Sequence, residues 1–135
     1  MIETTLQNNP IVPVAVVSRP GIMQQSLRAS LAACPGIVVV ASFGDGLTAL
    51  NRLAGLQDGI LVIDSNLLDE EVDALLGSVK VRQPGIRCLV LAQSRLRHQQ
   101  LLVDGADAVI LRNGSPQDLQ QALSRLVQDS IDPRA

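Results

Sequence analysis

The sequence predicts a three-layer α/β sandwich, because five apolar runs alternate with five segments of helical spacing. The runs are rich in Val, Ile and Leu without polar alternation, which is typical of strands covered on both faces of a parallel sheet. Turn residues such as Pro35-Gly36 and Pro84-Gly85 separate helices from strands. Right-handed crossovers then place helices on both faces of the sheet. The predicted strands are residues 12–17, 37–41, 60–63, 87–91 and 108–111.

The segments between these runs carry apolar stripes that favour helices. The last of them has a clear start, because a Ser cap at Ser115 is followed by Pro116 in the first turn and by the acid Asp118 three residues after the cap. The stripes are Ile22, Leu27 and Leu31; Leu47, Leu50, Leu53 and Leu56; Val72, Leu75, Leu76 and Val79; Leu96, Leu101, Leu102 and Val103; and Leu119, Ala122, Leu123 and Leu126.

The length of 135 residues fits one domain. We expect residues 1–11 to form a flexible N-terminal tail, because they are polar and lack periodicity. Residues 12–128 form the predicted domain. Residues 129–135 lose the helical pattern and are expected to be a tail or the start of a linker.

Composition excludes several classes of function. Aromatic residues make up 1% of the chain and the net charge is −2, so this segment is not expected to bind nucleic acid. No apolar run approaches the ~20 residues that cross a bilayer, and no charged, apolar leader opens the chain. We therefore expect a cytoplasmic protein without membrane contact. The two cysteines, Cys34 and Cys88, lack metal-ligand spacing and are expected to be reduced core residues.

The candidate site lies where the predicted strands end. Sites in open α/β sheets are found at the carboxyl ends of the strands. An aspartate, Asp64, ends the buried run 60–63. Ser18 and Arg19 end the first strand, Ala92 the fourth and Arg112 the fifth. These side chains are therefore expected to surround Asp64.

Several local sequences resemble the receiver domain of bacterial two-component response regulators, in the subfamily with LuxR-type output domains. The most specific segment is residues 105–116, GADAVILRNGSP. Residues 28–31, RASL, and 44–46, GDG, fit the same subfamily. The resemblance covers residues 12–128 and implies a flavodoxin-like topology with a five-stranded parallel sheet.

The resemblance also implies a role for each site position. Asp64 occupies the phosphoacceptor position. Ser18 and Arg19 stand where receivers carry two acids that bind Mg²⁺, so the acidic pair is degenerate. Ala92 replaces the Thr or Ser that contacts the phosphoryl group, and Arg112 replaces the Lys that pairs with phosphate. The switch aromatic is replaced by Val109.

These replacements argue against a metal site. Mg²⁺ prefers oxygen ligands in octahedral geometry, whereas Arg19 adds a positive charge. We therefore expect no cofactor; any Mg²⁺ would bind Asp64 and the carbonyl of Asn66. We hypothesise instead that Asp64 is a polar anchor paired with Arg19 or Arg112, an arrangement that would mimic the metal-bound or phosphorylated state. The alternatives are a working acceptor and a carboxylate that caps the following loop.

The leading functional interpretation is a degenerate receiver that is not an enzyme. It would act through protein contacts, on an attached output domain that is expected to regulate transcription, or on a separate partner. The expected contact face is formed by the fourth helix, fifth strand and fifth helix, and a homodimer is expected by family analogy. One alternative is an active phosphoacceptor that uses Asp64. Another is a small-molecule-binding or catalytic α/β domain, although the chain lacks an activated nucleophile: Ser18 is expected to be a helix N-cap.

Overall fold

The computed structural model describes residues 11–131. Within this range the chain forms one five-stranded parallel sheet with the strand order β2-β1-β3-β4-β5. This arrangement confirms the predicted α/β class and its parallel pairing. The strands are β1 (Val12–Val17), β2 (Ile37–Phe43), β3 (Gly59–Ile63), β4 (Ile86–Ala92) and β5 (Ala108–Leu111).

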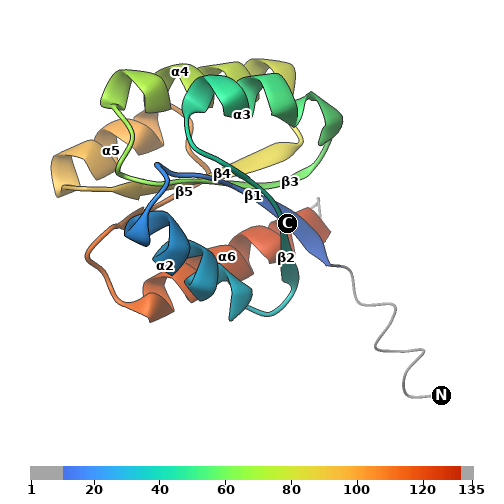
Figure 1. The fold of residues 1–135 in the computed structure, drawn as a ribbon, viewed down its shortest axis with the longest axis vertical. Helices are drawn as coiled ribbons and strands as arrows, with labels where there is room; N and C mark the ends of the chain where they lie inside the picture. Colours follow the sequence, from blue (N-terminus) through green and yellow to red (C-terminus); the bar gives the residue numbers. More distant parts are fainter. Residues whose placement is uncertain (1–10, 132–135) are drawn as a thin grey trace.

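Helices cover both faces of the sheet (Figure 1). On one face lie α3 (Gly46–Arg52), α4 (Asp69–Arg82) and α5 (Arg95–Val103), and on the other lie α2 (Ile22–Ala32) and α6 (Pro116–Ile131). A short 3-10 helix, η1 (Leu53–Gly55), follows α3. Helix α6 ends at Ile131, three residues beyond the predicted domain boundary at residue 128. The predicted tail at residues 1–10 and 132–135 lies outside the described residues.

The core consists of two aliphatic layers, one on each face of the sheet. Odd-numbered residues of β3, such as Leu61 and Ile63, pack with the α3–α4–α5 layer, and even-numbered residues such as Ile60 and Val62 pack with the α2–α6 layer. Because side chains alternate along a strand, both sets of residues are buried only when both faces are covered. All five residues of β3 are buried.

The edge strand β2 departs from the predicted burial. Val38 and Val40 are exposed and the other five residues are half-buried, so the prediction that every strand is covered on both faces is wrong here. Val38 and Val40 are exposed by 48% and 55%. The register with β1 also shifts, from Val14 opposite Val39 to Ala15 opposite Ala41, which leaves Val40 as the extra residue of a bulge.

Some predicted core positions on helices are exposed. Of the stripe on α5, only Leu101 is buried, whereas Leu96 and Val103 are exposed by 67% and 86%. Ile22 and Leu47, each in the first turns of its helix, are also exposed. A short helix on a sheet buries only a narrow stripe, and spacing alone does not say which apolar residues lie within it.

The start of α6 and the two buried thiols agree with the sequence-based predictions. Ser115 Oγ accepts a hydrogen bond from the Asp118 N–H at 3.3 Å, and Asp118 Oδ2 accepts one from the Ser115 N–H at 3.1 Å. This reciprocal pair confirms the predicted start of α6. Both cysteines are buried and free, and burial raises the pKa of Cys88 to about 12. Within residues 11–131, no helix is both long and apolar enough to span a membrane.

Replacement of glycine by alanine is expected to have opposite effects on stability at two positions, Gly59 and Gly77. Gly59 has φ +130°, and a Cβ there would lie 2.6 Å from the Pro13 carbonyl oxygen. We expect Gly59→Ala to destabilise the fold by about 1 to 3 kcal/mol. Gly77, in the middle of α4, has open space around it, and Gly77→Ala is expected to stabilise the fold by about 0.5 to 1 kcal/mol. Urea unfolding of both variants measures this contrast; equal midpoints would contradict it.

Candidate functional site around Asp64

The carboxyl ends of four neighbouring strands meet at Asp64. Backbone hydrogen bonds carry the ladder one residue past the strands, from the Asp64 N–H to the Val17 carbonyl at 2.9 Å and from the Arg112 N–H to the Ala92 carbonyl at 2.8 Å. This register places Ser18 directly beside Asp64. Parallel strands end at the same edge of the sheet, which is why residues far apart in sequence converge there.

Asp64 is buried with zero solvent exposure, and both of its carboxylate oxygens have partners. Oδ2 accepts a hydrogen bond from Ser18 Oγ at 2.7 Å. Oδ1 accepts one from the Ser65 N–H at 2.7 Å and lies 3.2 Å from Arg112 Nε. The Nε–H lacks hydrogen-bond geometry toward any described residue, so the contact with Arg112 is an ion pair without a directed bond. A buried carboxylate requires such compensation.

Ser18 is a partner of the carboxylate and not the helix cap that the sequence suggested. Helix α2 begins later, after Gly21, and has no side-chain cap. The Ser18 hydroxyl donates to Asp64 and accepts from Asn66 Nδ2 at 3.1 Å. Asn66 Oδ1 in turn accepts from the Arg19 N–H at 3.1 Å. Asn66 thus enters the network through its side-chain amide, whereas the sequence had suggested its backbone carbonyl as a metal ligand.

Arg19 is directed away from Asp64, so of the two arginines hypothesised to pair with this carboxylate it is Arg112, and not Arg19, that does so. Its guanidinium group contacts Glu71 Oε1 at 2.5 Å and donates to the Gly44 carbonyl at 3.2 Å. Glu71 Oε2 also accepts the Gly46 N–H at 2.7 Å. A single arginine therefore ties the end of β1 to the turn before α3 and to the first turn of α4.

The two remaining switch positions lie in the core and carry no polar group. Ala92 ends β4 and is 1% exposed, and Val109 lies in the α3–α4–α5 layer opposite Val90. Neither provides a hydroxyl or an aromatic ring beside Asp64. The nearest polar link between the β3 and β4 ends is Gln93 Nε2, which donates to the Ser65 carbonyl at 2.7 Å.

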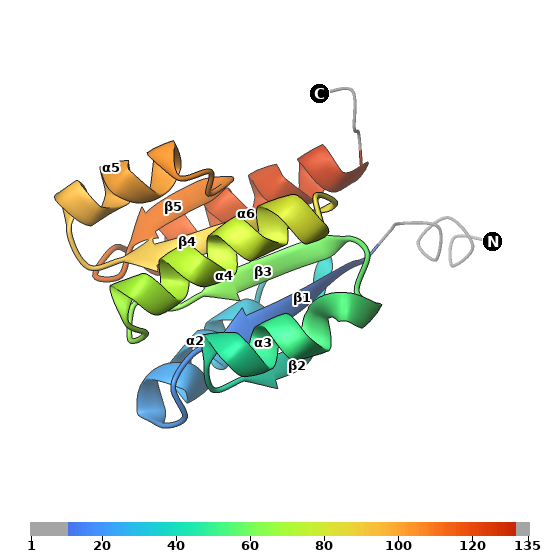
Figure 2. The ribbon, with the colours of Figure 1, turned by 90° about the horizontal axis from the view of Figure 1, so that it is seen from above.

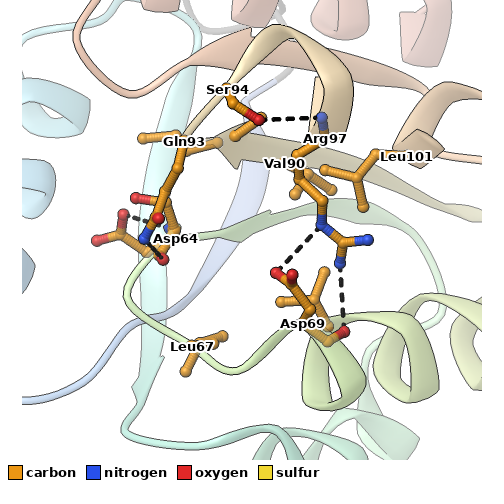
Figure 3. A pocket seen from close by; sticks show the side chains of 12 residues that line it. Asp64, Leu67, Asp69, Val90, Gln93, Ser94, Arg97 and Leu101 are labelled. Atoms are coloured by element: carbon orange, nitrogen blue, oxygen red, sulfur yellow. Dashed lines mark hydrogen bonds and ion pairs between the residues drawn. The ribbon is translucent and has the colours of Figure 1, made fainter. Parts of the chain in front are cut away.

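A cavity of about 100 Å³ lies between the segment that follows β3 and the segment that follows β4. Asp64 and Ser65 are among its lining residues (Figure 3). Arg97 of α5 extends over Asp69 at the start of α4 (Figure 3). Its Nε lies 3.2 Å from Asp69 Oδ1, and its Nη2 lies 2.9 Å from Asp73 Oδ1. The Arg97 side chain is only 13% exposed. This arginine therefore links α5 to α4.

Sequence reasoning missed Glu71 and Arg97 as organising residues. The acidic run 69–71 suits the positive end of the α4 dipole, and this local explanation accounts for it without Arg19. Arg97 lies 28 and 24 residues from the two carboxylates that it contacts. No local pattern reports pairs at such separations.

The donor set around Asp64 does not suit Mg²⁺. This ion requires several open oxygen ligands, usually including one or two carboxylates. Asp64 is the one carboxylate at the centre, and its oxygens already have three partners. Glu71 is paired with Arg19. Within residues 11–131, no three His, Cys, Asp or Glu residues are grouped closely enough to hold a metal ion.

Comparison with solved structures finds receiver domains. The isolated REC (receiver) domain of RcsB from Salmonella enterica serovar Typhimurium, with BeF3⁻, aligns with a TM-score of 0.77 and 23% identity over 87% of this chain and 89% of that chain. A LuxR-family two-component response regulator from Aurantimonas sp. SI85-9A1 aligns with a TM-score of 0.78 and 18% identity over 87% and 86% of the two chains.

The chain has the fold of a receiver domain. No protein-family model and no curated protein matches the sequence. In the structure of the two-component response regulator RcsB–DNA complex, the TM-score is 0.77 and the identity 24%, over 87% of this chain. The present chain spans 61% of the length of that RcsB chain. The fold prediction is therefore confirmed, including its flavodoxin-like topology.

The Arg112–Asp64 pair can be tested with a double-mutant cycle. Arg112→Met is expected to lower the free energy of unfolding by about 2 to 4 kcal/mol, because it leaves a buried carboxylate without its cation. Asp64→Asn with Arg112→Met should cost less than the sum of the two single changes, by about 1 kcal/mol or more. Urea unfolding measures all three variants.

A matched control is Arg19→Met. The Arg19 side chain is 40% exposed and touches Glu71 but not Asp64, so we expect a loss of about 1 kcal/mol or less. Its effect should add to that of Asp64→Asn. Additive effects of Arg112 and Asp64 changes, or strong coupling between Arg19 and Asp64, would contradict the network described above.

Proposed function

We propose that this chain is a receiver-type module of two-component signalling that no longer works by phosphorylation of Asp64 and acts through protein contacts. The observation that carries the proposal is the state of Asp64. Its carboxylate is inaccessible to solvent and fully partnered by Ser18, the Ser65 N–H and Arg112. An acceptor must instead present a free oxygen to an incoming phosphoryl group and to the cations that neutralise it.

The charge distribution supports the same proposal. Phosphoryl transfer needs a metal or cationic groups aimed at the moving group. Here Arg19 is held by Glu71, and Arg112 is held at the acceptor carboxylate itself. Ala92 offers no hydroxyl. The Arg112–Asp64 ion pair therefore takes the place of a phosphoryl group, whose charge would be added and removed. Because this pair is permanent, the site remains in one state.

A groove next to β5 supports a role in protein contacts. It has a volume of about 680 Å³, lies between α5 and α6, and has β5 residues Val109 and Leu111 along its floor. Leu102 is 46% exposed there, among the polar and basic side chains Arg95, His98, Gln121 and Arg125. An apolar floor with a polar rim is the composition of many protein interfaces. This is the face that the resemblance implies.

The output that we propose is transcriptional, through a DNA-binding domain attached to the chain or through a partner protein. The likeness to RcsB, whose structure was solved in complex with DNA, supports this choice. We propose that the present segment does not contact DNA, since its net charge of −2 offers no general attraction to phosphates.

The decisive test is incubation with acetyl phosphate and Mg²⁺, followed by intact-mass measurement. We expect no phosphoryl adduct on the wild-type chain, because Asp64 has no free oxygen and no metal site. Beryllofluoride with Mg²⁺ should likewise leave the amide NMR spectrum unchanged. An adduct that disappears in Asp64→Ala would overturn the proposal in favour of an active phosphoacceptor.

A restored variant provides the matched positive control. Ser18→Asp, Arg19→Asp, Ala92→Thr and Arg112→Lys together return the acidic pair, the hydroxyl and the lysine of receivers to this fold. We expect this variant to bind Mg²⁺ in a titration followed by NMR and to gain the adduct. Circular dichroism establishes that the variant is folded before it is compared.

A further inference from the structure

The cavity between the segments that follow β3 and β4 has a hydroxyl group without a partner in its lining. Ser65 Oγ is buried and makes no hydrogen bond to any of residues 11–131, and the whole residue is only 9% exposed. A buried hydroxyl without a hydrogen bond costs free energy, and most such groups in folded proteins have a partner. Because Ser65 lines the cavity, a molecule inside it can supply the missing hydrogen bond.

The rest of the lining is largely apolar. Val72 of α4, Val90 of β4 and Leu101 of α5 all contribute to it, and all three are buried. Figure 2 shows α4 and α5 next to each other on one face of the sheet, and Arg97 extends from α5 to Asp69 at the start of α4 (Figure 3). A molecule in the cavity therefore contacts two helices and the sheet at once.

The charged side chains of the lining favour an uncharged occupant. Each of them already has a partner of opposite charge: Asp64 lies beside Arg112, and Asp69 lies beside Arg97. A charged molecule would find no free counter-ion here, and burial of an unpaired charge is costly. A neutral molecule avoids this cost.

The volume of about 100 Å³ limits the size of the occupant. A water molecule takes up ~30 Å³ of liquid, and an apolar cavity of ~150 Å³ accepts benzene. The cavity thus has room for about three waters or for one molecule of about four non-hydrogen atoms. An apolar lining offers waters few hydrogen bonds, and their displacement by an apolar group favours binding.

We propose that this cavity is a binding site for a small uncharged alcohol. Its hydroxyl group hydrogen-bonds to Ser65 Oγ, which is able both to donate and to accept. Its short hydrocarbon part packs against Val72, Val90 and Leu101. Binding involves no reaction at Asp64, so the site does not depend on the proposed loss of phosphorylation.

An amide NMR titration of the wild-type chain with propan-2-ol tests the proposal. We expect saturable shifts of the signals of Ser65, Val72 and Val90, with a millimolar dissociation constant because few atoms make contact. The isopropylammonium ion has the same shape but a positive charge in place of the hydroxyl group, and acetate is of similar size and negative. Neither ion should shift these signals. The titration contains no phosphoryl donor, so its result is separate from the test of phosphorylation.

Two variants examine the two halves of the site. Ser65→Ala removes the hydroxyl group but keeps the backbone N–H that binds Asp64, and should weaken binding of propan-2-ol by about fivefold or more. Val72→Leu places an extra methylene group in the cavity and should weaken binding by about threefold or more. Circular dichroism establishes that both variants are folded.

The matched controls lie away from the cavity. Ser124→Ala changes an exposed serine of α6, and Val81→Leu changes a valine of α4 that is 82% exposed. Both should bind propan-2-ol like the wild type. Absence of saturable shifts would show that the cavity holds water only and would overturn the proposal. Equal binding by Ser65→Ala or Val72→Leu, equal binding of either ion, or weaker binding by a control would overturn it as well.

Discussion

The buried carboxylate of Asp64 is the constraint on which the rest of the site depends. A charge with no solvent exposure must find its partners inside the protein. Ser18, the Ser65 N–H and Arg112 provide them from the ends of three different strands. Their positions then decide which residues remain available for a ligand. Because the carboxylate already has these partners, the centre of the site serves to hold the ends of β1, β3 and β5 together.

The second arginine of the region stabilises a different junction. Arg19 occupies a place where receivers have an acid, and it pairs with Glu71 at the start of α4. Glu71 also binds the Gly46 N–H at the start of α3. Together with Arg97, which links α5 to α4, this contact holds the loops around Asp64 by internal ion pairs. Loops held in this way have less freedom to rearrange around a bound ion, which is consistent with a constitutive module.

The surface of the molecule adds two features that the central site does not explain. The groove beside β5 combines an apolar floor with a polar rim, and the β2 edge combines open backbone with valines. The two surfaces lie at opposite edges of one sheet.

The sequence by itself determined the class of fold and the location of the site at the carboxyl ends of the strands. Uninterrupted Val/Ile/Leu runs predicted five parallel strands, and the position of Asp64 after one of them predicted a site at the strand ends. Such features are local, since side-chain hydrophobicity and turn residues act within a few positions. Tertiary structure alone decided which arginine meets Asp64, that Ser18 binds the carboxylate, and which valines of β2 stay exposed. Those outcomes depend on strand order and helix placement, which bring together groups that are many residues apart.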